Sequence, residues 1–188
     1  MTRIIVIIAV ALLVGVYISW RAGRLDRLHA RLDTARAALD AALLRRSSVA
    51  LELASSGLLD PATSLLVAGA AHDARTAPPG DQELAESDLA RTLRAAFGQP
   101  GFRASLDGRP GAAELLAETE AAAHQVFLAR RFYNSAVTTT RTARRRWLVR
   151  LFRLAGSASP PQFFEIDDSL VATGGDEAAP PGVSRLAG

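Results

Sequence analysis

The stretch RLDRLHARLDTARAALDAALLRR, residues 24–46, decides the fold. Leucine or alanine recurs in it at alternating spacings of three and four residues, and aspartate recurs at every seventh position beside that apolar stripe. This spacing places the apolar side chains on one face of a helix that packs lengthwise against other helices. The stripe consists of Leu25, Leu28, Leu32, Ala35, Leu39 and Ala42, and the acids are Asp26, Asp33 and Asp40. We therefore expect an all-α fold, with the acids on a solvated face beside arginines of the same helix.

An uncharged apolar run, IIVIIAVALLVGVYISW, occupies residues 4–20 directly before this stretch. Its length is at the short end of a membrane-spanning helix, which needs about 20 residues to cross a hydrocarbon core of about 30 Å. A secretory signal peptide is the alternative, but no small-x-small cleavage site follows the run. Tyr17 and Trp20 suit the boundary between lipid and water. We expect residues 1–23 to form a retained transmembrane anchor in the cell membrane.

The arginines that flank the run indicate its orientation. Arg3 and the α-amine lie before it, whereas Arg21, Arg24, Arg27 and Arg31 follow it. Because positive charge is retained on the cytoplasmic side, this bias favours a cytoplasmic body in a single-pass protein. An exported body is the alternative.

Proline and glycine divide the rest of the chain into three further helices. Asp60 and Pro61 suit the N-cap and first position of a helix over residues 61–75. Asp81 is expected to cap a helix that ends at Phe97, and residues 99–111 are expected to form an irregular connection. A long last helix without proline or glycine is expected over residues 112–154.

Three domains follow from this division. Residues 1–23 form the anchor, and residues 24–156 are expected to form an antiparallel four-helix bundle. Residues 157–188 hold a short aromatic segment of strand-like composition, at residues 163–166, and a tail rich in glycine, alanine and proline that is expected to be disordered.

Composition excludes several classes of function. All 22 basic residues are arginine, yet the formal net charge is only +3 and aromatic residues make up only 6% of the chain. Nucleic-acid binding proteins have a larger and more clustered excess of positive charge, so we expect no nucleic-acid partner. The chain has no cysteine, which excludes disulfides, thiol nucleophiles and thiolate metal sites.

Four short motifs resemble the LemA family. The sequence ARRFYNSAV at residues 129–137 resembles the signature of that family's last helix, and LDAALLRR at residues 39–46 resembles a segment of its first helix. Residues 163–165 (FFE) and residues 86–89 (ESDL) lie where the family has an aromatic-Phe-Glu element and an acidic-polar-leucine pattern. The chain departs from the family after Arg46, so it resembles a divergent bacterial member with a GC-rich coding sequence. The resemblance implies a membrane-anchored helical bundle at the cell envelope, and the family has no settled biochemical function.

No motif for catalysis or metal binding is present. His29, His72 and His124 are isolated, and none has a second ligand at helical spacing. The sequence has no phosphate-binding glycine loop, nucleophile elbow or HExxH helix. Glu114 and Glu118 are interpreted as a solvated helix face. We expect no enzyme activity, no cofactor and no metal site.

The LemA-like motifs supply a candidate structural or partner-facing cluster. Asp40 lies about 30 Å along a helix from Trp20, and the same distance back from Arg150 reaches Arg131. An antiparallel bundle would therefore bring Asp40 level with Arg130 or Arg131, which predicts a charged latch between the first and last helices. Asn134 is interpreted either as a polar residue that fixes helix register or as a partly exposed residue without that role. The full cluster comprises Asp40, Arg45, Arg46, Arg130, Arg131, Tyr133 and Asn134.

A second candidate surface lies at the basic, amphipathic end of the last helix. Helices of this kind bind anionic lipid surfaces, although the apolar side could instead close the bundle. The residues are Arg144, Arg145, Arg146, Trp147, Arg150, Leu151 and Phe152.

These features predict a non-enzymatic scaffold or protein-interaction module that is anchored in the lipid bilayer, binds a protein partner of unknown identity and self-associates. The alternative is an anionic-lipid-binding or membrane-remodelling protein that acts through the basic end of the last helix.

Overall fold

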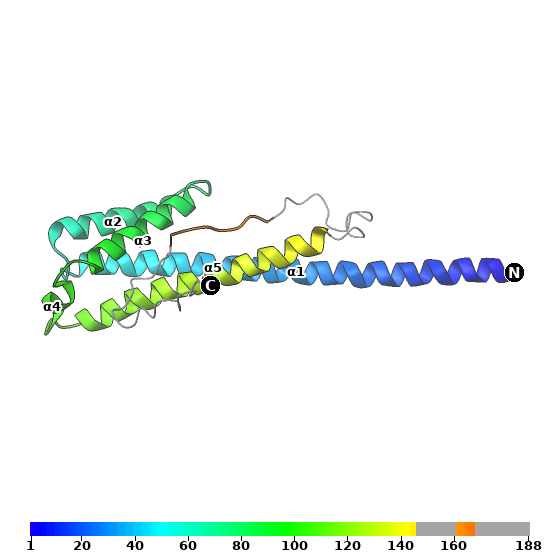
Figure 1. The fold of residues 1–188 in the computed structure, drawn as a ribbon, viewed down its shortest axis with the longest axis horizontal. Helices are drawn as coiled ribbons and strands as arrows, with labels where there is room; N and C mark the ends of the chain where they lie inside the picture. The colour runs from blue at the N-terminus through cyan, green and yellow to red at the C-terminus, as the bar shows by residue number, and fades with distance from the viewer. Residues whose placement is uncertain (146–160, 168–188) are drawn as a thin grey trace, which may run out of the picture.

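The computed structural model describes residues 1–145 and 161–167, which contain five helices and no strand (Figure 1). The helices are α1 (Thr2–Ser55), α2 (Pro61–Thr76), α3 (Gln82–Phe97), α4 (Phe102–Leu106) and α5 (Ala112–Arg145). The all-α prediction is confirmed. The predicted continuation of the last helix to residue 154 and the predicted disordered tail at residues 172–188 lie outside the described residues.

Helix α1 joins the apolar run to the heptad stretch without a break. It has 54 residues and therefore extends for about 80 Å. Proline first occurs at Pro61, so no residue within α1 lacks the N–H that its hydrogen bonds require. The helix ends at Ser55, and Gly57 then takes a left-handed conformation (φ 72°) that turns the chain back. In Figure 1 the N-terminal part of α1 projects beyond all the other helices.

Helices α1 and α5 pack along each other in opposite directions. Their shared core contains Leu39 and Leu43 from α1 and Val126 and Val137 from α5, all nearly inaccessible to solvent. Asp26, Asp33 and Asp40 are exposed. The heptad interpretation is therefore correct in its central turns, where the apolar stripe is covered and the acids face outward.

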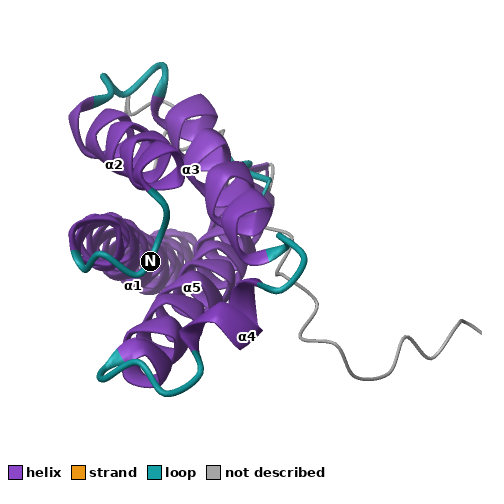
Figure 2. Cartoon of the chain, turned by 90° about the vertical axis from the view of Figure 1, so that its left-hand side faces the viewer, coloured by secondary structure: helices purple, strands orange, loops and turns teal. Residues whose placement is uncertain are grey.

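Helices α2 and α3 form a hairpin that covers the C-terminal part of α1 (Figure 2). The predicted N-cap at Asp60 is confirmed, because its Oδ1 accepts hydrogen bonds from the backbone N–H groups of Ala62 and Thr63, both at 3.1 Å. Hydrogen bonding from Thr63 is the main cause that lowers the pKa of Asp60. Asp81 occupies the predicted N-cap position of α3, and the helix ends at Phe97 as predicted. Its side chain makes no capping hydrogen bond, because its backbone is already near-helical (φ −107°, ψ −3°) rather than extended.

The connection between α3 and α5 is more ordered than its sequence suggests. It contains the short helix α4, which the prediction of an irregular loop over residues 99–111 missed. Phe102 and Leu106, four residues apart, bury their side chains in the core, and the ring of Phe102 stacks on Phe97 with centroids 5.6 Å apart. Tertiary burial of these two side chains thus stabilises a turn of helix among glycines and prolines.

Viewed along its length, the molecule shows α2 and α3 on one side of the α1–α5 pair (Figure 2). This arrangement is a helical bundle. Within the described residues, none of the helices combines the length and the apolar character that a membrane span requires.

The core between α1 and α5 can be tested with two leucines of α1. Leu39 is completely buried, whereas Leu44 remains 55% exposed. We expect Leu39→Ala to lower the free energy of unfolding by about 2–5 kcal/mol, because it leaves a cavity against α5. The matched variant Leu44→Ala should change it by about 0.5 kcal/mol or less. Thermal unfolding followed by circular dichroism measures both, and equal losses would contradict the packing.

Candidate functional site

The most specific site in the structure is formed by side chains of α3 and α5 that hydrogen-bond residues 161–167. This segment has an extended trace (Figure 1), and we call the set of side chains that bind it the groove. Asn134 of α5 binds the centre of this segment at two points. Its Nδ2 donates a hydrogen bond to the carbonyl oxygen of Phe164, and its Oδ1 accepts one from the N–H of Phe164, both at 3.0 Å. The amide side chain therefore satisfies the donor and the acceptor of one extended residue, as a neighbouring strand would.

Two further residues of α5 bind the start of the segment. The hydroxyl of Tyr133 donates a hydrogen bond to the carbonyl oxygen of Gln162 at 2.9 Å. The Nε of Arg141 donates one to the carbonyl oxygen of Pro161 at 2.7 Å. The segment therefore runs antiparallel to α5, with its first residue beside Arg141.

Helix α3 binds the other end. Glu83 Oε1 accepts a hydrogen bond from the N–H of Glu165 at 3.2 Å, and Ser87 Oγ accepts one from the N–H of Asp167 at 3.1 Å. Arg94 Nη2 lies 2.9 Å from the Asp167 carboxylate and 3.3 Å from its carbonyl oxygen. The two helices thus bind the main chain from opposite sides.

One side chain anchors the segment in the core. Phe164 is 3% exposed and joins the apolar cluster between α1 and α5. The guanidinium of Arg36, on α1, lies 5.5 Å from the centre of the Phe164 ring and 5.7 Å from that of Tyr133. Such a cation over an aromatic face contributes about 0.5–2 kcal/mol. Arg36 also donates a hydrogen bond to Gln82 Oε1 at 3.1 Å, so it links α1 to the first turn of α3.

A buried ion pair fixes α3 against α1. Arg46 and Glu86 are only 1% and 2% exposed, and the guanidinium binds both the Glu86 carboxylate and, at 2.9 Å, the Glu86 carbonyl oxygen. Burial raises the pKa of the Glu86 carboxyl above its usual value of 4.5, although the charge of Arg46 acts in the opposite direction. Arg46 therefore binds side chain and main chain of the same α3 residue, which sets the position and rotation of that helix.

The members of the cluster predicted from sequence separate into different contacts. Tyr133 and Asn134 bind the segment, Arg46 binds Glu86, and Arg45 forms an exposed ion pair with Glu118 of α5. The acidic member, Asp40, pairs with Arg36 one turn earlier on its own helix at 3.1 Å.

The predicted latch between Asp40 and the arginines of α5 is therefore not observed, since Asp40 pairs with Arg36 instead. Arg131 is exposed, with its guanidinium 5.4 Å from the Phe127 ring, and Arg130 is half-buried. The predicted level along the bundle is correct, because Leu39 of α1 and Tyr133 of α5 share one core cluster. The predicted partner is not the one observed, because Asp40 pairs with Arg36, one turn earlier on its own helix.

Sequence reasoning missed five residues of the groove: Arg36, Glu83, Ser87, Arg94 and Arg141. Two signals were present. The acidic-polar-leucine motif at residues 86–89 includes Ser87, and the aromatic FFE element at residues 163–165 includes the anchor Phe164. Neither motif indicated that one would bind the other.

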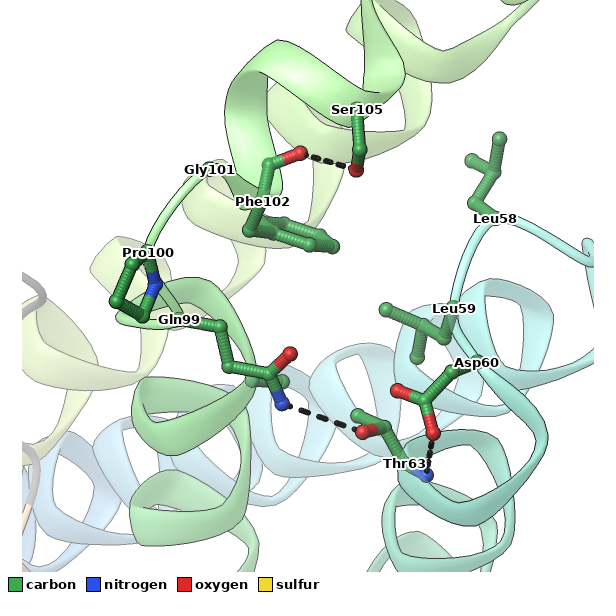
Figure 3. Close-up of a pocket in the computed structure, with 10 residues that line it drawn as sticks. Leu58, Leu59, Asp60, Thr63, Gln99, Pro100, Gly101, Phe102 and Ser105 are labelled. Carbon is green, nitrogen blue, oxygen red and sulfur yellow. Dashed lines mark hydrogen bonds between the residues drawn. The ribbon is translucent and has the colours of Figure 1, made fainter.

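A second hollow, of about 180 Å³, lies where α2, α3 and α4 meet (Figure 3). Its polar groups bind one another: Asp60 caps α2, and Gln99 Nε2 donates a hydrogen bond to Thr63 Oγ1 at 3.3 Å. The hollow is smaller than the roughly 300–1,000 Å³ of typical ligand pockets. Across residues 1–145 and 161–167, no group of three histidine, aspartate or glutamate side chains gathers as a metal-binding set.

Comparison with known proteins returned no match to a family model, to a curated protein or to a solved structure. Membership of the LemA family therefore stays a prediction from the motifs. The predicted membrane surface, Arg144–Phe152, falls on side chains outside the described residues and also stays a prediction.

The role of Asn134 can be tested by amide hydrogen exchange. We expect Asn134→Ala to speed exchange of the Phe164 N–H by about 10- to 100-fold, because two hydrogen bonds of about 1 kcal/mol each are lost. The control is Ser135→Ala, at an exposed position one residue away, which should leave the exchange rate unchanged. An unchanged rate in Asn134→Ala would contradict the binding mode.

The buried carboxyl of Glu86 predicts a pH dependence. The pKa of Glu86 is higher in the folded than in the unfolded chain, so its contribution to stability is complete below pH 4.5 and is lost as the pH rises through the folded pKa. The non-titrating variant Glu86→Gln provides the reference. We expect the stability of the native chain relative to Glu86→Gln to fall between pH 4.5 and pH 7, measured by thermal unfolding at both values. A relative stability that rises with pH would mean that Arg46 lowers this pKa instead.

Proposed function

We propose that this protein is a non-enzymatic, single-pass membrane protein whose helical bundle acts as a scaffold or protein-interaction module at the cell envelope. Over the described residues no helix meets the length and apolar character of a membrane span, so the proposal rests on the exposed apolar side chains of α1 before the bundle begins. Large apolar side chains point outward there on all sides of the helix, and a helix that is apolar all round is typical of a lipid environment. They include Ile4, Ile5, Val6, Ile7, Ile8, Leu12, Leu13 and Val16, followed by Tyr17 and Trp20.

The continuity of α1 gives this anchor a mechanical role. Arg46, which binds α3, lies 26 residues beyond Trp20 on the same helix, a distance of about 40 Å. A chain anchored by the N-terminal part of α1 would hold the α2–α3 hairpin at a fixed height above the bilayer. We propose that the bundle lies on the cytoplasmic side, because the arginines that follow the apolar run outnumber the positive charges before it.

The outer face of the α2–α3 hairpin supports the proposal of a protein partner. Leu65 and Leu66 of α2 and Leu84 of α3 are strongly exposed and border one open hollow of about 640 Å³. Asp73, Asp81 and Asp88 also line it. Exposed apolar side chains interspersed with carboxylates suit a protein that presents apolar side chains together with arginine or lysine.

Membrane anchoring can be tested by two charges placed in the apolar run. We expect the full chain to remain with the membrane pellet after an alkaline carbonate wash. The double variant Ile8→Arg with Leu12→Arg should be released, because each arginine adds about 2.5–3.5 kcal/mol to the cost of insertion at the centre of a span.

The matched control is Leu65→Arg, which places the same charge on an exposed leucine of α2 and should stay in the pellet. Release of the unaltered chain by the wash would contradict anchoring, and so would retention of the double variant.

A further inference from the structure

The groove binds residues 161–167 as it would bind a separate peptide. Its hydrogen bonds are directed to main-chain atoms of the segment, and Phe164 supplies the buried anchor. We propose that the groove also accepts this segment from a second copy of the chain, so that two copies exchange residues 161–167. The inference names the partner of the groove and rests on the proposed function as a protein-interaction module.

The length of the connection supports the exchange. Pro161 is hydrogen-bonded to Arg141, one turn before α5 ends at Arg145. The 15 residues 146–160 join these two neighbouring points. Fifteen residues span at most about 50 Å when fully extended, and less if the last helix continues to residue 154 as its sequence predicts. The same connection can therefore reach the groove of an adjacent molecule.

A second copy is the occupant with the right chemistry. It offers the same main-chain groups to Asn134, Glu83 and Ser87, and the same phenyl ring to the pocket beside Arg36. Exchange of an identical element between copies creates no new contact type, so its energetic cost is low. Anchoring in one bilayer would place the grooves of neighbouring copies at the same height and raise their effective concentration.

Exchange can be tested with two variants, one that weakens the segment and one that weakens the groove. Phe164→Ala weakens the segment and leaves the groove intact, whereas Asn134→Ala weakens the groove and leaves the segment intact. Neither variant can form a full-strength contact with itself. A mixed pair can form one, between the groove of the Phe164→Ala copy and the segment of the Asn134→Ala copy.

The experiment co-expresses these two full-length copies with different tags. Because the chain has no native cysteine, a thiol cross-linker reacts only with the cysteines that are introduced. The Phe164→Ala copy also carries Glu83→Cys in its groove, and the Asn134→Ala copy carries Glu165→Cys in its segment. Glu83→Cys removes one hydrogen bond of the groove, but it does so equally in this sample and in its control, so the comparison depends on Phe164 and Asn134. A short bismaleimide should join the two copies, since the carboxylate of Glu83 contacts the N–H of Glu165. In the matched control the two cysteine substitutions are swapped between the copies, and the yield should fall about tenfold or more.

A third sample defines the remaining outcomes. A single chain that carries both Glu83→Cys and Glu165→Cys should give intramolecular and intermolecular products. An intramolecular product alone, with no joined pair in the mixed sample, would overturn the exchange, as would equal yields from the two cysteine arrangements. A segment from a different protein as the true occupant would also leave the mixed pair unjoined. Failure of membrane anchoring would be detected separately, by the carbonate wash. It would not affect the cross-linking yield, which can be measured in the membrane fraction and in the soluble fraction.

Discussion

The buried ion pair between Arg46 and Glu86 is the constraint on which the rest of the structure depends. Two charges removed from water cost several kcal/mol each, and the pair is tolerated only where its geometry is well defined. Arg46 meets this condition in part: its Nη2 binds both the carboxylate and the main-chain carbonyl of Glu86, whereas its buried Nε has no hydrogen-bond partner among the described residues. With Glu86 directed at α1, the α3 residues Glu83 and Ser87 are directed at residues 161–167. One contact in the core thus sets the geometry of the groove.

Helix α1 combines two environments in one continuous element. Its C-terminal half packs against α2 and α5, and its N-terminal half presents apolar side chains that no other described part of the chain covers. Because the helix has no proline, its backbone hydrogen bonds continue without a break from the apolar run into the packed half. The groove lies beside the packed half, where Arg36 connects α1 to both the segment and α3. The proposed anchor, the support of the hairpin and the contacts to residues 161–167 therefore involve the same helix.

Local sequence signals predicted the helices well and the site poorly. Asp60 and Pro61 act within one turn, so the start of α2 was predictable. Helix α4 was not, because its stability comes from burial of Phe102 and Leu106 against distant residues. The groove joins residues about 30 and 80 positions apart in the chain. Its hydrogen bonds run from side chains to main-chain atoms, and such contacts leave no periodic pattern in the sequence. The helical rise per residue predicted the correct height of Asp40 along the bundle axis. It carries no information about which side of the helix faces α5.

The most direct test replaces the ion pair by an apolar pair, Arg46→Met with Glu86→Leu, and measures hydrogen exchange at Glu165 and Asp167. Apolar replacements of a buried ion pair are often neutral or stabilising, so the free energy of unfolding should change by about 2 kcal/mol or less. Neither substituted residue is among the groups that hydrogen-bond these two amides. If the ion pair positions α3, both amides should exchange about tenfold faster or more while the bundle stays folded. Unchanged exchange at both amides would contradict the account, because the groove would then keep its geometry without the contact proposed to set it.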